Sequence, residues 1–107
     1  MYIAMNRFKV AKGREAEFEE MWMKRDSYLH EVPGFLEFHL LRGPENEDHR
    51  LYTSHSMWAS YEAFQGWTRS EAFRKAHANA GSMPDGLTLG PPEFEGFEVV
   101  GEVKSDA

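Results

Sequence analysis

The sequence predicts a single α+β domain whose strands and helices follow the order β-α-β-β-α-β. Segments in which apolar residues alternate flank segments in which they recur every three to four positions. Gly and Pro residues separate the segments. A chain of 107 residues has the usual length of one domain. We therefore expect one domain over residues 1–103 and a polar tail over residues 104–107.

The first predicted strand, Tyr2 to Val10, carries one unexpected side chain. Its alternation puts five residues on one face: Tyr2, Ala4, Asn6, Phe8 and Val10. Asn6 is a polar amide in the middle of this apolar row, which costs free energy unless the amide finds partners. Asn6 is therefore either hydrogen-bonded to neighbouring backbone or a candidate ligand contact.

A helix is predicted from about Arg14 to Glu31, because apolar residues form a stripe at helical spacing. The stripe contains Phe18, Met21, Trp22, Leu29 and Val32. Arg25 occupies a position that this stripe would give to an apolar side chain. Arg25 either packs its stem and leaves its head in water, or points toward a bound ligand. Pro33-Gly34 ends the helix.

The remaining elements complete the ferredoxin-like split unit. Strands are predicted over residues 35–42, 50–58 and 94–103, with a polar hairpin loop at 43–48 and a Gly- and Pro-rich loop at 81–92. Ser60 and Ser70 are candidate N-caps of two short helical pieces, and Trp67 lies at the predicted break between them. Helices on one face leave the other sheet face bare.

The bare face predicts a dimer. Its expected residues include Ile3, Met5, Phe97 and Val99, which are apolar. A second copy placed sheet to sheet would cover them, so we expect a homodimeric α/β-barrel.

Composition excludes several classes of protein. The formal net charge of −6 argues against a nucleic-acid partner. No apolar run approaches the roughly 20 residues of a membrane span, and the N-terminal segment lacks the pattern of a signal peptide. The absence of cysteine excludes disulfides, zinc–thiolate sites, iron–sulfur clusters and a thiolate haem ligand. We therefore expect a cytoplasmic protein.

Other candidate residues have two readings each. His77, at a helix end with small neighbours, either interacts with the helix dipole or binds iron. Trp67 is either a core aromatic residue or the wall of a flat pocket. Glu37 and His39 could share a strand face, which is weak evidence for a metal site because no HxxxH or HExxH spacing exists. Aromatic residues that could line a pocket or form ordinary core are Phe8, Phe18, Trp22, Phe64 and Phe73.

The chain resembles the IsdG-type haem-degrading monooxygenases of the antibiotic biosynthesis monooxygenase (ABM) superfamily. The resemblance lies in AMNRF around Asn6, in PGFLEFHLLRG over residues 33–43, in WASYEAFQGWTRSEAFRKAH over residues 58–77 and in FEVV near the C-terminus. In that family an Asn on the first strand, a Trp and a His form the catalytic set. Asn6, Trp67 and His77 occupy the matching positions.

The resemblance implies a function for each of these residues. His77 would be the proximal ligand of the haem iron, Trp67 would push the porphyrin out of plane, and Asn6 would donate a hydrogen bond on the distal side. Haem would be both cofactor and substrate, and O2 and electrons from a reductase or a small-molecule reductant would complete the reaction. Arg25 and Phe73 would be further haem contacts.

Two other functions stay open at this point. One is a cofactor-independent ABM-type monooxygenase that oxidises a quinol or an aromatic substrate. The other is a non-enzymatic haem-binding protein that leaves the macrocycle intact.

Overall fold

The computed structural model describes residues 1–24, 28–80 and 84–106, with the backbone alone for residues 76–80. Its strands are β1 (Tyr2–Ala11), β2 (Phe35–Glu45), β3 (His49–Trp58) and β4 (Glu93–Glu98). Its helices are α1 (Glu15–Lys24), the 3-10 turn η1 (Leu29–Glu31), α2 (Tyr61–Thr68) and α3 (Glu71–Ala80). This order confirms the predicted succession of elements, including the division of the second helical region.

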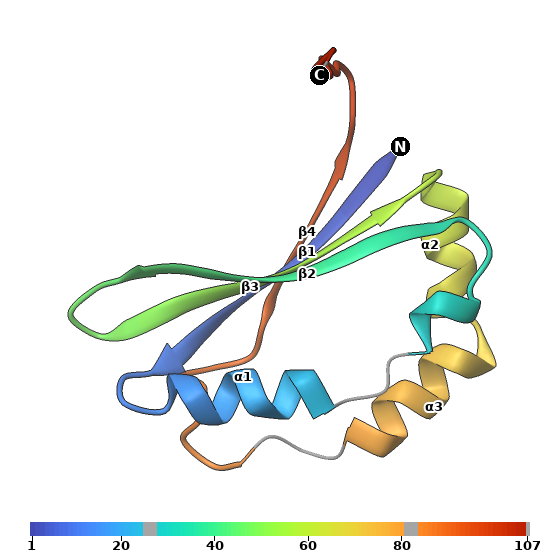
Figure 1. The fold of residues 1–107 in the computed structure, drawn as a ribbon. Coiled ribbons are helices and arrows are strands. Elements are labelled where there is room, and N and C mark those ends of the chain that lie inside the picture. The colour runs from blue at the N-terminus through green and yellow to red at the C-terminus, as the bar shows by residue number, and fades with distance from the viewer. Residues whose placement is uncertain (25–27, 81–83, 107) are drawn as a thin grey trace.

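The four strands form one antiparallel sheet in the order β2-β3-β1-β4. Helices α1, α2 and α3 lie on one side of this open sheet (Figure 1). The prediction of a ferredoxin-like α+β fold is thereby confirmed.

The helix-facing side of the sheet carries two separate core clusters. The first contains Phe8, Val10, Phe18, Tyr52 and Leu87. The second contains Tyr2, Ala4, Leu29 and Trp58, with Val32, Phe35, Phe38, Ala63, Phe64 and Trp67 packed against them. Along β1 the two clusters are separated by Asn6, which is half-buried where its row neighbours are buried. The predicted face of β1 is therefore correct.

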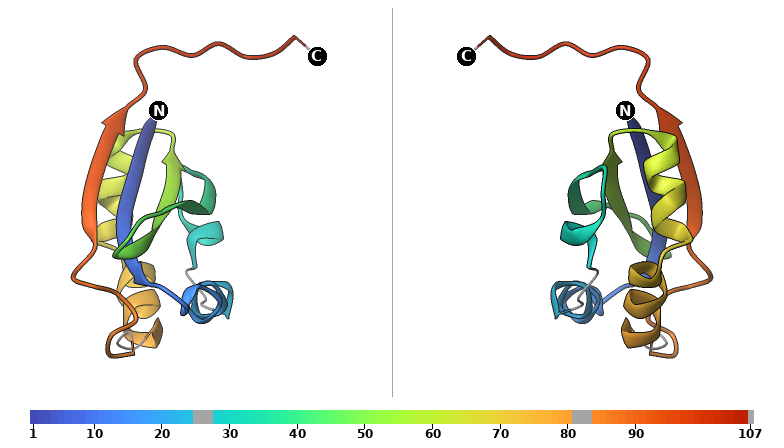
Figure 2. Two further views of the ribbon diagram at one scale, coloured as in Figure 1. Left: turned by 90° about the vertical axis from the view of Figure 1, so that its left-hand side faces the viewer. Right: turned by 90° about the vertical axis from the view of Figure 1, so that its right-hand side faces the viewer.

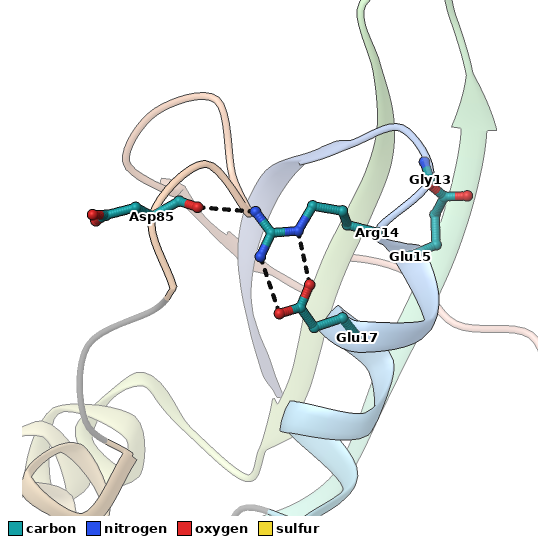
Figure 3. A network of polar contacts seen from close by, with 5 residues as sticks. All are labelled: Gly13, Arg14, Glu15, Glu17 and Asp85. Atoms are coloured by element: carbon teal, nitrogen blue, oxygen red, sulfur yellow. Dashed lines mark hydrogen bonds and ion pairs between the residues drawn. The ribbon is translucent and has the colours of Figure 1, made fainter.

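The Gly- and Pro-rich loop before β4 closes the first cluster. Leu87 is fully buried there, and its carbonyl accepts a hydrogen bond from the Ala11 amide at 2.8 Å. Arg14 donates to the Asp85 carbonyl at 2.9 Å while it pairs with Glu17 at 2.7 Å (Figure 3). The described part of this loop is thus fastened to β1 and to the start of α1.

The prediction of one helix from Arg14 to Glu31 is wrong. Helix α1 ends at Lys24, and Tyr28 has a left-handed backbone with φ of 58° before η1 begins. The two ends of the predicted stripe serve different clusters, since Phe18 packs in the first and Leu29 in the second. The predicted stripe is therefore divided between α1 and η1.

Two strand boundaries also differ from prediction. The hairpin loop is shorter than residues 43–48, because β2 continues to Glu45 and the Asn46 side chain accepts from the Asp48 and His49 amides at 2.8 Å. The last strand ends at Glu98 rather than Val103. Glu98 pairs with Tyr2, where β1 begins, so the following residues have no strand beside them.

The C-terminal segment therefore leaves the body of the domain (Figure 2). The Val99 amide still donates to the Met1 carbonyl at 2.9 Å, but Val100 and Val103 are 97% and 98% exposed. Val99 thus lies just beyond the sheet rather than on its bare face.

The side of the sheet opposite the helices is partly apolar, as predicted. Register places Ile3 beside Met57 and Phe97, and Met5 beside His55. Phe97 is 47% exposed. In the described part of the chain, no helix is long and apolar enough to cross a membrane.

Candidate functional site

A strip of short side chains crosses the helix-facing side of the sheet, from Ala4 of the second core cluster to Asn6, which separates the two clusters. Asn6 pairs with Ser54, and Ala4 pairs with Ser56. Directly paired residues of antiparallel strands point to the same face, so these four side chains form a low floor. We call this set of Ala4, Asn6, Ser54 and Ser56 the polar strip.

The two serines of the polar strip differ in their hydrogen bonding. The Ser56 hydroxyl accepts from Trp58 Nε1 at 3.0 Å and donates to the Ala4 carbonyl at 3.3 Å. The Ser56 hydroxyl therefore forms its hydrogen bonds within the sheet. Among the described residues, no hydrogen bond satisfies the Ser54 hydroxyl or the Asn6 carboxamide. These two groups can serve a ligand.

Aromatic rings stand on both sides of the polar strip. On the β4 side, Phe94 pairs with Asn6 in register and stacks on Phe64 of α2, with ring centroids 5.8 Å apart and planes 12° apart. On the β2 side, Phe38 stacks on Trp22 of α1 at 5.7 Å and 19°. Flat aromatic walls beside a floor of short side chains suit a planar apolar ligand.

Some of these wall residues were predicted from the sequence and others were not. Phe8 and Phe18 are buried in the first cluster and are core. Trp22, Phe64 and Phe73 are half-buried. Ser54, Phe38 and Phe94 were not named. The alternation in TSHSMW, residues 53–58, was the available signal for Ser54, because it puts Ser54 on the same face as Tyr52 and Trp58.

Trp67 lies inside the last turn of α2, so its predicted position at a helix break is wrong. The break follows at Arg69 and Ser70. Ser60 caps α2 by accepting from the Ala63 amide, and Ser70 accepts from the Phe73 amide at the start of α3, both at 3.1 Å. Both predicted caps are confirmed. Gly66 stays helical, which is tolerated at the cost of some helix propensity.

The Trp67 ring is part of an aromatic chain that leads from the second cluster to α3. It stacks on Trp58 at 5.4 Å and 29°, and meets Phe73 edge-on at 4.8 Å and 83°. Trp67 is half-buried. The core reading of this residue is thus borne out by its contacts.

The other predicted haem contacts are placed less completely. His77 belongs to α3 (Glu71–Ala80), one turn after Phe73, but its side chain lies outside the described residues. Arg25 also lies outside the described residues. The structure therefore places Asn6 on the helix-covered side of the sheet, brings Trp67 into contact with Phe73, and places the backbone of His77 on the helix that carries Phe73.

A separate polar cleft of about 330 Å³ lies between α1 and the β2–β3 hairpin, lined by Glu15, Ala16, Glu19, Arg42 and Arg50. Arg42 Nε donates to Glu19 at 2.9 Å and to the Tyr52 hydroxyl at 3.2 Å, and Tyr52 also donates to Glu19. Hydrogen bonds from Tyr52 and Arg42 lower the pKa of Glu19. Burial and the bond to Glu19 raise the pKa of Tyr52. This network fixes α1 to the sheet.

The fold and the polar strip define a small α+β domain in which aromatic rings lie on both sides of a row of short side chains. Residues 1–79 match the family model described as antibiotic biosynthesis monooxygenase. The chain belongs to the antibiotic biosynthesis monooxygenase family.

Known proteins similar to this chain include both haem-degrading and cofactor-independent enzymes. A heme-degrading monooxygenase of Bacillus thuringiensis subsp. konkukian (strain 97-27) is 33% identical over 100 residues, which cover 94% of this chain and 92% of the relative. The heme-degrader MhuD of Mycobacterium tuberculosis, solved with two hemes in its active site, is 31% identical with a TM-score of 0.72, covering 97% of this chain and 100% of that one.

SnoaB, a cofactor-independent oxygenase from Streptomyces nogalater, is 25% identical with a TM-score of 0.66, and the match covers 97% of each chain. The fold alone therefore does not separate the two chemistries, since one fold hosts several activities. The site residues must decide between them.

Proposed function

We propose that this protein is a haem-degrading monooxygenase that binds haem across the polar strip and opens the porphyrin oxidatively. The observation that carries the proposal is the Asn6 carboxamide on a floor of short side chains, between stacked aromatic pairs. The heme-degrading relatives, which match nearly the whole chain at 31–33% identity, support the same assignment.

The residues around the polar strip fit a haem group. A porphyrin is flat and apolar across its face, and Phe64–Phe94 and Phe38–Trp22 offer two flat walls. Its centre requires polar partners, and Asn6 and Ser54 are polar groups that no hydrogen bond within the described residues satisfies. When bound, haem supplies the iron at which O2 is activated and also the carbon skeleton that is oxidised.

The proposed residue functions rest on the family resemblance. His77 on α3 would hold the iron through a neutral imidazole. The Asn6 amide would donate a hydrogen bond where negative charge develops. Trp67 would press on the macrocycle, supported by its ring contacts with Trp58 and Phe73. Phe73 and Arg25 would contact the ring and its propionates.

Binding is tested first by titration of the haem-free protein with haemin. We expect a shifted Soret band that saturates at defined stoichiometry. His77→Ala should remove the shift, and His30→Ala, at an exposed histidine of η1, is the matched control that should retain it. Weak, unsaturable absorbance changes in the wild-type protein would refute haem binding and favour cofactor-independent oxidation.

Turnover is tested by adding ascorbate to the haem complex in air with catalase present. Loss of the Soret band, with release of iron and a tetrapyrrole that mass spectrometry identifies, supports the enzyme. A Soret band that persists would identify a haem carrier instead. The proposed cellular electron donor is a reductase or a small-molecule reductant, and the proposed location is the cytoplasm, which cell fractionation checks.

The proposed assembly is a homodimer in which two sheets pack by their bare faces into a barrel. Ile3, Met5, Met57 and Phe97 supply the apolar surface. Phe97→Glu should yield a monomer in size-exclusion chromatography with light scattering. Phe94→Glu is the matched control, because Phe94 is similarly exposed on the opposite face and should leave the mass unchanged.

A further inference from the structure

Four oxidisable side chains form a row on the helix-facing side of the sheet. Trp67 of α2 stacks on Trp58 of β3, with ring centroids 5.4 Å apart. Trp58 pairs directly with Tyr2 of β1, so these two side chains point to the same face. The Tyr2 ring meets Tyr61 of α2 edge-on at 5.1 Å. We call the set of Trp67, Trp58, Tyr2 and Tyr61 the Trp–Tyr row.

Phe64 of α2 packs against the middle of the Trp–Tyr row. Its ring centroid lies 5.7 Å from that of Trp58 and 5.3 Å from that of Tyr2. Both separations are typical of aromatic rings in contact. Each member of the row is therefore joined to the next by a direct ring contact or through Phe64.

Exposure increases along the row from Trp58 to Tyr61. Trp58 is fully buried, Tyr2 is 8% exposed and Tyr61 is 43% exposed. The Gln65 amide donates a hydrogen bond to the Tyr61 hydroxyl at 3.5 Å. At the other end of the row stands Trp67, the residue that the family resemblance assigns to the haem. The row thus connects a proposed haem contact with a tyrosine at the surface.

The residue types of the row suit the transfer of single electrons. Indole and phenol rings lose one electron far more readily than phenylalanine or aliphatic side chains do. Cysteine, whose thiolate is easily oxidised, is absent from the chain and cannot compete. Packing alone does not require indoles and phenols, because apolar side chains of similar volume fill a core equally well. Two Trp and two Tyr residues in series therefore indicate a redox function.

Oxidation of a tyrosine also requires a destination for its phenolic proton. Burial raises the pKa of the Tyr2 phenol, and Tyr61 and Glu98 raise it further. Tyr2 therefore keeps its proton at neutral pH and must release it when it loses an electron. Glu98 pairs with Tyr2 in register and offers a carboxylate on the same face. Tyr61, which is exposed, can release its proton to water.

We propose that the Trp–Tyr row conducts electrons from Tyr61 at the surface to Trp67. A Trp67 indole that has lost one electron and its N–H proton regains the electron through Trp58 and Tyr2, and the proton from water. Tyr61 supplies the electron, releases its phenolic proton to water and becomes a neutral phenoxyl radical. A reductant such as ascorbate then restores Tyr61 by giving it one electron and one proton.

The inference rests on the proposed function only for the source of the oxidant, which is haem with O2. Pulse radiolysis of the haem-free protein tests the row independently, with azide radicals that oxidise tryptophan in preference to tyrosine. Absorption of the tryptophanyl radical should decay while that of the tyrosyl radical rises, at a rate independent of protein concentration. Trp22→Phe is the parent protein for this test, because Trp58 and Trp67 are then its only tryptophans.

Tyr2→Phe should slow this transfer several-fold, because the row loses its buried phenol. Tyr52→Phe is the matched control, since Tyr52 is a buried tyrosine of the first cluster and should leave the rate unchanged. Circular dichroism establishes that each variant is folded. Transfer in Tyr2→Phe at the rate of the parent protein would overturn the proposal.

Tyr61→Phe tests the outer end of the row and alters only a half-exposed phenol, so it decides the matter if Tyr2→Phe does not fold. The radical should then stay on buried Tyr2, where ascorbate quenches it several-fold more slowly than in the parent protein. Quenching at an unchanged rate would show that Tyr61 is not the exit of the row.

The inner end is tested in protein loaded with haemin and given hydrogen peroxide, which is reduced to water, in the presence of a nitroso spin trap. Peptide mass spectrometry should find the trap on Tyr61 in the wild type and much less of it in Trp67→Phe. Equal trapping in the two proteins would refute Trp67 as the inner end. Failure to bind haemin would count against the proposed function alone, because the radiolysis result does not depend on haem.

Discussion

Replacement of Leu87 by alanine tests whether the loop before β4 is a structural part of the domain. Leu87 is fully buried against Phe8, Val10 and Phe18 in the first core cluster. Leu→Ala changes at buried sites cost about 2–5 kcal/mol, and more where the cavity cannot collapse. Hydrogen bonds from Ala11 to the Leu87 carbonyl and from Leu89 to the Lys9 carbonyl, both 2.8 Å, hold the backbone in place.

We therefore expect Leu87→Ala to lower the free energy of unfolding by about 3–4 kcal/mol. Urea denaturation followed by circular dichroism measures this, at fixed protein concentration because association would add to stability. Leu89→Ala is the matched control, since Leu89 lies in the same loop but is 51% exposed. Its expected effect is below about 0.5 kcal/mol. Equal effects of the two changes would refute the inference that Leu87 completes the first cluster.

Three further predictions concern the polar strip and the α1 network. Asn6→Leu should keep or raise the free energy of unfolding, because no hydrogen bond within the described residues satisfies the amide. The same change should slow ascorbate-driven haem loss at least about tenfold. A loss of stability would show that Asn6 is structural. Ser54→Val should raise the haem Kd about tenfold by filling the floor, while Ser54→Ala should not; equal Kd values would contradict a ligand above Ser54. Glu19→Gln should destabilise the protein at neutral pH. Because Tyr52 and Arg42 lower the pKa of Glu19 below the reference 4.5, its contribution is complete above that value and is lost as pH falls through the lowered pKa, so urea midpoints of the two proteins should converge in acid.

The order of elements could be predicted from the sequence because each signal is local. Alternation identified β1, and hydroxyl side chains at Ser60 and Ser70 identified two helix starts that the structure confirms. Asn6 was recognisable for the same reason, as a polar exception within a local pattern. Its function depends on family resemblance, because an amide on a strand is compatible with many ligands.

Features that depend on pairing between distant segments could not be predicted. Ser54 becomes a candidate site residue only because it pairs with Asn6. The pairing of His39 with His55 depends on the length of the β2–β3 hairpin. That hairpin turns at Asn46, later than the polar composition of residues 43–48 suggests. The end of α1 could not be predicted either, because the apolar stripe continues in the sequence although its members pack in two different clusters.

The polar strip separates the interior into two clusters, and for this reason the stability of the protein should depend on whether substrate is bound. On the proposed function, a macrocycle lying over Asn6 and Ser54 bridges the two clusters and becomes part of the protein's interior. At a ligand concentration of 100 times Kd, such binding adds about 2.7 kcal/mol to the free energy of unfolding. On the same proposal, oxidative opening of the ring would remove the flat molecule that joined the clusters, and the protein should become less stable around its product. Amide hydrogen exchange in β1 should accordingly slow when haem binds and quicken again as the haem is consumed.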